Sequence, residues 1–398
     1  MAADSAPERT RPTRRFAFVL VGYAFLVVMV GTTLPTPLYP IYQAEYGYSG
    51  LTTTVIFAVY AIGVIAALLL FGRLSDQIGR RPVLLGGIVC SALSAVVFLL
   101  SGSLTPLLIG RFLSGLSAGV FTGTATATLL DLVPDRRRPH AGLVAAVVNM
   151  LGLGLGPVLA GLLAEFAPAP LRLPYAVSLA LLVPAALGVA LQAEPRPGSG
   201  RVDVRPQRLR VPPAARSLFV RASIAGFAGF AVLGLFSAVS PLFLGEVLGV
   251  HDHAVVGLVV FALLGTSTLG QVLTSRGSEH RALRGGSLVL AVGTALVGAS
   301  LALASFPLLL AGAVVAGFGQ GASFRAGLTS VGRISPPDQR AEVSSSFFVI
   351  CYVAISIPVI GVGALAQAVG LVAAGTAFSA LVVLLALIAV ALLRGPAD

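Results

Sequence analysis

Twelve runs of about 20 predominantly apolar residues, separated by short polar gaps, dominate this sequence. A helix needs about 20 such residues to cross the hydrocarbon core of a bilayer. Charged residues make up only 10% of the chain, and a soluble domain carries about 25%. The sequence therefore predicts an all-α membrane protein with 12 transmembrane helices. The predicted spans are residues 16–37, 51–72, 82–102, 104–130, 141–166, 171–192, 217–244, 254–275, 285–304, 306–331, 342–368 and 370–394.

The arginines give the orientation of these spans. The chain has no lysine, and 23 of its 26 basic residues fall in the N-terminal tail, in every second gap, or at the ends of spans that face this side. The opposite side holds only Arg172, and Arg111 and Arg325 lie further inside spans. Because arginine is enriched in cytoplasmic loops, this bias predicts a multi-pass protein of the cell inner (plasma) membrane with both termini in the cytoplasm. The scatter of these charges over many short gaps also argues against nucleic acid as a partner.

A polar linker divides the spans into two groups of six. Residues 193–216 are rich in Pro, Gly and Arg, which is typical of a loop. The predicted division is an N-tail (1–15), an N-terminal bundle (16–192), a cytoplasmic linker (193–216), a C-terminal bundle (217–394) and a C-tail (395–398). Pro40 and Glu45 recur as Pro241 and Glu246 after the seventh span, so the bundles are interpreted as a duplication. Such repeats place a substrate site between them, near the midplane.

The gap after the second span combines turn-forming glycine with charge. Gly72 allows close approach at a helix end, and Gly79 permits a tight turn. Asp76 offers an acceptor, while Arg80 and Arg81 offer charge-assisted donors. We expect this cluster to latch the two bundles together on the cytoplasmic side when the protein is open to the outside. The alternative is that its arginines only fix topology.

Residues 72–84 (GRLSDQIGRRPVL) closely resemble the loop signature of the major facilitator superfamily, although Gln77 stands where the family has a basic residue. The resemblance implies two pseudo-symmetric six-helix bundles that work as a transporter by alternating access. The matching positions are Gly72, Leu74, Asp76, Gly79, Arg80, Arg81 and Leu84.

Arg111 lies inside the fourth span, where insertion of an arginine costs at least ~2.5 kcal/mol, so it should face a partner or water. The surrounding residues 107–119 resemble a second motif of the same superfamily, with Ser114 in place of a glutamine. The resemblance implies a role for Arg111 in proton transfer. The alternative is an arginine that extends to the nearby outer surface.

The fifth span carries a stripe of small residues, Gly152, Gly156 and Gly161, with Pro157 inside it. The glycines favour close helix packing, and the proline bends the helix. This pattern resembles the motif of the drug:proton antiporter branch, although Ala160 replaces one glycine. Ordinary packing glycines are the alternative.

Polar residues inside the other spans are candidates for the substrate cavity, or for hydrogen bonds between helices. These candidates are Tyr60, Asn149, Thr266, Gln271, Gln320 and Arg325. No acid lies at the centre of a span, so the candidates for proton coupling are Asp131, Asp76 and Glu45 together with Arg111. The missing central acid favours a neutral or anionic substrate over a cationic drug.

No enzyme signature, phosphate-binding loop or metal-ligand spacing is found, so we expect no catalytic activity, no cofactor and no metal. The leading prediction is a monomeric transporter in the lipid bilayer that exports small molecules in exchange for protons. A sugar or metabolite uptake symporter and a uniporter are the alternatives within transport. A receptor or scaffold without transport activity is the alternative of another class.

Overall fold

The computed structural model describes residues 11–196, 198, 200, 206, 207, 209–336 and 339–393. Outside the described residues lie 1–10, 197, 199, 201–205, 208, 337, 338 and 394–398. The first half contains α1 (Arg11–Thr33), η1 (Thr36–Leu38), α2 (Tyr39–Tyr46), α3 (Gly50–Phe71), α4 (Leu74–Ile78), α5 (Arg80–Leu99), α6 (Leu104–Asp131), η2 (Asp135–Arg137), α7 (Arg138–Phe166) and α8 (Leu173–Ala190). The second half contains η3 (Pro213–Ala215), α9 (Arg216–Ala238), α10 (Ser240–Glu246), α11 (His253–Leu273), α12 (Glu279–Leu303), α13 (Phe306–Ile334), α14 (Arg340–Val369) and α15 (Leu371–Leu392).

The predicted all-helical membrane fold is confirmed. Among the described residues, 12 helical segments are long and apolar enough to cross a bilayer. Each overlaps one predicted span, including the last two, which separate at Gly370. The φ of Gly370 is 86°, a backbone conformation that glycine adopts without steric cost.

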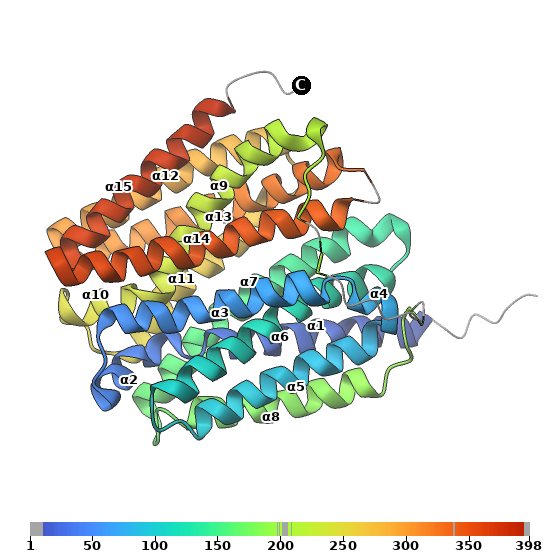
Figure 1. Cartoon of the computed structure of the whole chain (residues 1–398), viewed down its shortest axis with the longest axis horizontal. Coiled ribbons are helices and arrows are strands. Elements are labelled where there is room, and N and C mark those ends of the chain that lie inside the picture. The colour runs from blue at the N-terminus through green and yellow to red at the C-terminus, as the bar shows by residue number, and fades with distance from the viewer. Residues whose placement is uncertain are drawn as a thin grey trace, which may run out of the picture.

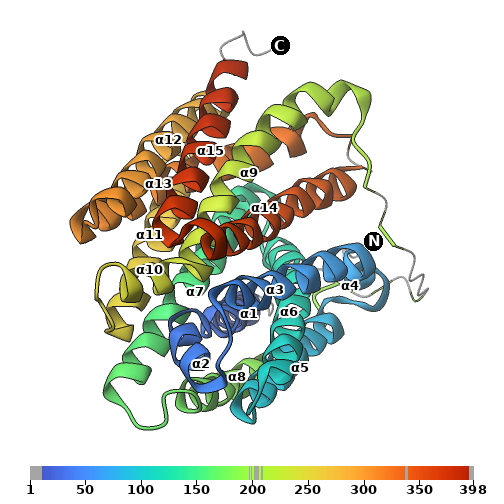
Figure 2. The ribbon, with the colours of Figure 1, turned by 60° about the vertical axis from the view of Figure 1, so that its left-hand side comes forward.

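The helices form two groups that lie side by side (Figure 1). Helices α1–α8 make one group and α9–α15 the other. Two buried apolar clusters lie within the first group, and the largest lies mainly in the second but also includes Phe57, Ala61 and Met150 of the first. The groups meet where α7 packs on α11 and where α3 packs on α14. Figure 2, turned by 60°, shows the same two pairs of helices, α7 with α11 and α3 with α14, along the boundary.

The outer surface of the bundle is apolar. Many large hydrophobic side chains are exposed along the spans, among them Leu100, Phe166, Leu191 and Ile357. Such exposure would be unfavourable in water, but contact with lipid chains removes this cost. The exposed belt therefore fits a protein that is surrounded by a bilayer.

Two short helices follow the long helices α1 and α9. Helix α2 contains Pro40 and Glu45, and α10 contains Pro241 and Glu246. Each proline occupies the second residue of its helix, where its missing N–H would have no partner in any case. The matched prolines thus start new helices at the ends of the first and seventh spans.

The two ends of the bundle are named here by what they carry. The linker side carries α4, the start of α5 and the linker residues, at the right of Figure 1. The distal side carries α2 and α10, at the left of the same view. The arginine-rich gaps of the sequence lie on the linker side.

Candidate functional site

A cavity of about 440 Å³ lies between the two groups of helices. Its lining comes from both halves, including α3, α6 and α7 on one side and α9 and α14 on the other. Toward the linker side it reaches the exposed residues Gly72, Asp76 and Ala341. Its other end is walled by Thr32 and Phe57, which are both buried. The cavity is therefore open on the linker side and closed on the distal side.

Arg111 forms part of the closed end of this cavity. Its side chain is only 2% exposed, so it does not extend to the distal surface. Nη1 donates a hydrogen bond to the carbonyl oxygen of Thr32, 2.6 Å away, and Nε has no hydrogen-bond partner among the described residues. The guanidinium carbon lies 4.7 Å from the ring centroid of Tyr60 and 5.3 Å from that of Phe57. Two aromatic faces and a carbonyl thus stabilise a buried cation.

Aromatic rings continue from this end across the boundary between the halves. Tyr60 on α3 meets Tyr352 on α14 with ring centroids 6.4 Å apart. Tyr352 in turn meets Phe230 at 6.1 Å, and Phe230 meets Phe324 at 5.1 Å. All four residues line the cavity. They are referred to below, together with Phe57, as the aromatic belt.

Two of the six residues predicted from sequence as cavity residues, Tyr60 and Asn149, line the cavity. The other four, Thr266, Gln271, Gln320 and Arg325, are not among its lining residues and belong to the packing of the second half.

The contacts of these four explain their positions. The side chain of Gln320 accepts a hydrogen bond from Ser267, so it joins α13 to α11. Thr266 donates to the carbonyl of Ala262 in its own helix, and Gln271 is 1% exposed within α11. Nη2 of Arg325 lies 3.3 Å from the carbonyl oxygen of Ser275, beyond the linker-side end of α11. Hydrogen bonding between helices, the alternative interpretation of these polar residues, accounts for Gln320. Thr266 bonds within its own helix instead.

Helix α7 closes the distal end by direct backbone contact with α11. A Cβ atom added to Gly257 would overlap the carbonyl oxygen of Pro157, and one added to Gly161 would overlap that of His253. The backbone N–H of His253 also donates to Glu165, at 3.0 Å. This contact between the halves is called the distal seal below.

The other two glycines of the stripe, Gly152 and Gly156, face α1. A Cβ atom on Gly152 would lie 2.8 Å from the carbonyl oxygen of Leu26, and one on Gly156 would overlap the carbonyl oxygen of Val30. The glycine stripe that the sequence singled out thus serves two interfaces, one within the first half and one between the halves. Any larger residue at these positions would force the helices apart.

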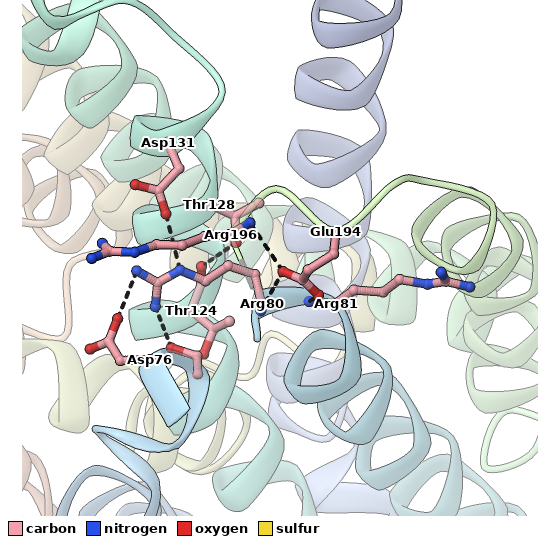
Figure 3. Close-up of polar contacts among 9 residues, drawn as sticks. Asp76, Arg80, Arg81, Thr124, Thr128, Asp131, Glu194 and Arg196 are labelled. Carbon is pink, nitrogen blue, oxygen red and sulfur yellow. Dashed lines mark hydrogen bonds and ion pairs between the residues drawn. The ribbon is translucent and has the colours of Figure 1, made fainter. Parts of the chain in front are cut away.

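At the linker side, Arg80 lies at the centre of a charged cluster (Figure 3). Its Nη2 is 2.9 Å from Asp76 and its Nε is 3.1 Å from Asp131, and Nη1 donates to Ser75. The Arg80 side chain is 6% exposed, so its charge depends on these partners. The side chain of Arg81 points away from the cluster in Figure 3.

The turn at Gly79 brings a further carboxylate to this cluster. Gly79 has a φ of 100°, and a Cβ atom there would lie 2.8 Å from Glu194. Glu194 accepts hydrogen bonds from the backbone N–H groups of Arg80, at 2.7 Å, and Arg81, at 3.0 Å. A carboxylate at the start of α5 satisfies two donors that have no partner within the helix. Nothing in the sequence indicated this role of Glu194, whose only signal is one acid two residues before an arginine in the linker.

The linker also enters the mouth of the cavity through Gln207. Its backbone N–H donates to the carbonyl of Leu69 on α3 at 2.7 Å, and its Oε1 accepts from Ser345 on α14 at 3.2 Å. Gln207 is 5% exposed and lies against Gly72. Gly72 was expected to allow close approach, and the segment that approaches it is the linker. Nothing in the sequence marks Gln207 for this position.

The charged contact that joins the halves on the linker side uses Arg73 and Glu342, 2.6 Å apart. The contacts of Arg80 described above stay within the first half and the beginning of the linker. Glu45, a predicted candidate for proton coupling, is exposed on α2 at the distal side and does not line the cavity.

A family model described as Major Facilitator Superfamily matches residues 21–298 of the chain. The chain belongs to the Major Facilitator Superfamily. A stretch of 190 residues is 33% identical to an uncharacterized MFS-type transporter of Mycobacterium tuberculosis, and covers 47% of this chain and 28% of that protein. Another of 196 residues is 26% identical to the quinolone resistance protein NorA of Staphylococcus aureus, and covers 48% of this chain and 49% of NorA. The chain therefore matches half or less of the length of these curated relatives.

Solved structures of the superfamily share the fold along almost the whole chain. The crystal structure of the human organic anion transporter MFSD10 (TETRAN) superposes with a TM-score of 0.72 at 20% identity, covering 96% of this chain and all of that one. A bacterial homolog of the human lysosomal transporter Spinster, solved in an inward-facing and unoccupied conformation, gives 0.71 at 16% identity and covers 96% of both chains. At these identities the likeness shows the shared fold.

Proposed function

We propose that this transporter exports small molecules, drug-like compounds or metabolites, across the cell inner membrane by alternating access and in exchange for protons. The arginine bias supports an orientation with the linker side and both termini in the cytoplasm. The partial likeness to NorA, a quinolone resistance protein, supports an export direction.

The observation that carries this proposal is a cavity between the two halves that is open at one end only. With the linker side in the cytoplasm, the structure is the state that takes up cargo from inside the cell. Release outside requires α7 to separate from α11 and the mouth near Gly72 and Ala341 to close. Rocking of two bundles around a central site meets both requirements.

The Arg80 cluster is the proposed site of proton coupling. Asp76 and Asp131 both pair with Arg80, and Asp76 lines the cavity mouth. Protonation of either carboxylate removes one of the two negative charges that hold Arg80. Such a change would alter the contacts of α4 and α6 at the mouth, where the halves must approach each other to close.

Proton movement in inside-out vesicles with an acidic interior tests this function. Antibiotics, dyes and sugars are added one at a time while the interior pH is followed. We expect a transported compound to collapse the gradient only when the protein is present, and Asp76→Asn to abolish the effect. Asp135→Asn is the matched control, because Asp135 forms an exposed pair with Arg138 away from the cavity.

Two results would contradict parts of the proposal. Protein-dependent movement of labelled compounds without any proton flux would rule out proton exchange and keep transport. A protein with a measurable ligand response but no movement of any compound would favour a receptor or scaffold.

A uniporter is the second candidate, and one observation favours it. Among the described residues that line the cavity, the only carboxylate is Asp76, at the mouth. A uniporter needs no proton carrier near its cargo, so it should move labelled cargo equally well with and without a proton gradient.

A further inference from the structure

We infer that the cavity binds an organic anion, in which a single negative charge is held by Arg111 and a flat aromatic body lies on the aromatic belt. The inference rests on the proposed transport function and names the class of its cargo.

Arg111 supplies a fixed positive charge. A guanidinium keeps its proton at all physiological pH values, so Arg111 cannot itself carry protons through a transport cycle. It has five N–H donors, and the hydrogen bond that the described residues provide goes to one neutral carbonyl, that of Thr32. Its Nε–H has no hydrogen-bond partner among these residues. A buried guanidinium in this state is an unfilled site for a bidentate anion such as a carboxylate.

The charges around the cavity leave this arginine without a counter-ion. Three of the described lining residues have acidic or basic side chains: Asp76, Arg80 and Arg111. Asp76 and Arg80 pair with each other at the mouth. None of the ion pairs among the described residues includes Arg111. The closed end is therefore positive, and it would repel a cationic cargo in a site of low polarity.

The rest of the cavity fits an aromatic body. The belt residues Phe230, Phe324 and Tyr352 line it together with Phe348 and many aliphatic side chains. The volume of about 440 Å³ is within the range of sites that hold drug-sized ligands. Belt residues come from both halves, so a bound aromatic ring would contact both bundles at once.

A series of naphthalene ligands tests the charge preference directly. The same ring carries a carboxylate, a carboxamide or an aminomethyl group, so only the charge and polar group change. Binding to the purified full chain in detergent is followed by ligand fluorescence, which the protein does not obscure because it has no tryptophan. We expect the carboxylate to bind at least about tenfold more tightly than the carboxamide, and the amine to bind most weakly.

Two substitutions then assign the preference to Arg111. Arg111→Gln should weaken carboxylate binding at least about tenfold while carboxamide binding changes little. Arg111→Lys keeps the charge but loses the planar fork, so it should retain a reduced preference for the carboxylate. Arg325→Gln is the matched control, because Arg325 is another arginine within a spanning helix and does not line the cavity. It should leave the order of the three ligands unchanged.

The outcomes separate this inference from the transport proposal. Equal binding of the three ligands, or Arg111→Gln weakening all three alike, overturns the anion site and gives Arg111 a structural role. Vesicle transport of neutral or cationic compounds would keep the transport proposal in that case. Selective carboxylate binding with no protein-dependent movement of the naphthoate would keep the anion site and overturn transport.

Discussion

The hydroxyl of Thr33 donates a hydrogen bond to the backbone carbonyl of Leu153, 2.8 Å away. Pro157, four residues after Leu153, has no N–H, so it leaves this carbonyl without its usual helical partner. Thr33, at the end of α1, fills the gap from the neighbouring helix. Pro157 in α7 is thereby linked to the end of α1, where the first span gives way to η1 and α2.

Loss of this bond should destabilise the protein. Thr33→Val keeps the shape of the side chain but leaves the Leu153 carbonyl unpaired, so the free energy of unfolding should fall by about 1–3 kcal/mol. Thr33→Ser keeps the hydroxyl and is the matched control. Thermal unfolding in detergent measures both. Equal melting temperatures for the two variants would show that the bond contributes nothing.

The distal seal should not tolerate a methyl group at Gly257. Gly257→Ala would push α11 away from the carbonyl of Pro157, which should open the distal end. The readout is labelling of Ser237→Cys, a cavity position, by an impermeant maleimide from outside the cell, after removal of Cys90 and Cys351.

We expect faster labelling in the Gly257→Ala variant. Gly361→Ala is the control, because a Cβ atom there would meet nothing within 4 Å. If both variants are labelled at the rate of the parent, the contact at Gly257 does not close the cavity.

Removal of the Glu194 carboxylate should loosen the start of α5. Glu194→Ala leaves the N–H groups of Arg80 and Arg81 without this acceptor and should lower the free energy of unfolding by about 1–2 kcal/mol. Glu194→Gln keeps one acceptor oxygen, so its free energy of unfolding should lie between those of Glu194→Ala and the parent protein. Glu246→Ala, an exposed glutamate at the end of α10, should have almost no effect in the same unfolding measurement. If Glu194→Ala lowers the free energy of unfolding as little as Glu246→Ala does, the Glu194 carboxylate does not stabilise the start of α5.

Gln207 should couple the linker to α14. Gln207→Ala and Ser345→Ala remove the two sides of one hydrogen bond, so their effects on unfolding should be non-additive by about 0.5–1.5 kcal/mol in a double-mutant cycle. Ser344→Ala changes the adjacent residue, which also lines the mouth, and its effect should add to that of Gln207→Ala. Additive effects for both serines would contradict the coupling.

The sequence predicted the spans well because their signal is local. Each span is a continuous apolar run, and the arginines between them alternate with the topology. Gly79 was also recognisable as a turn, since a positive φ at a helix junction favours glycine wherever the helices then lead.

The cavity residues were harder to predict because transmembrane helices are apolar on all sides. A polar residue such as Gln320 can face the cavity or another helix, and only the packing of α13 on α11 decides between the two. Glu194, Gln207 and Thr33 depend on contacts between segments far apart in the chain. No local pattern indicates such partners.

The two halves are joined on the linker side and on the distal side by interactions that respond differently to dissolved salt. The linker side depends on charged pairs such as Arg73 with Glu342, which weaken as ionic strength rises. The distal seal at Gly257 and Pro157 is a contact of backbone and small side chains, which salt does not screen. In the proposed orientation, a barrier of this kind stays closed whether the medium outside the cell is dilute or saline, while the charged end faces a cytosol of regulated composition.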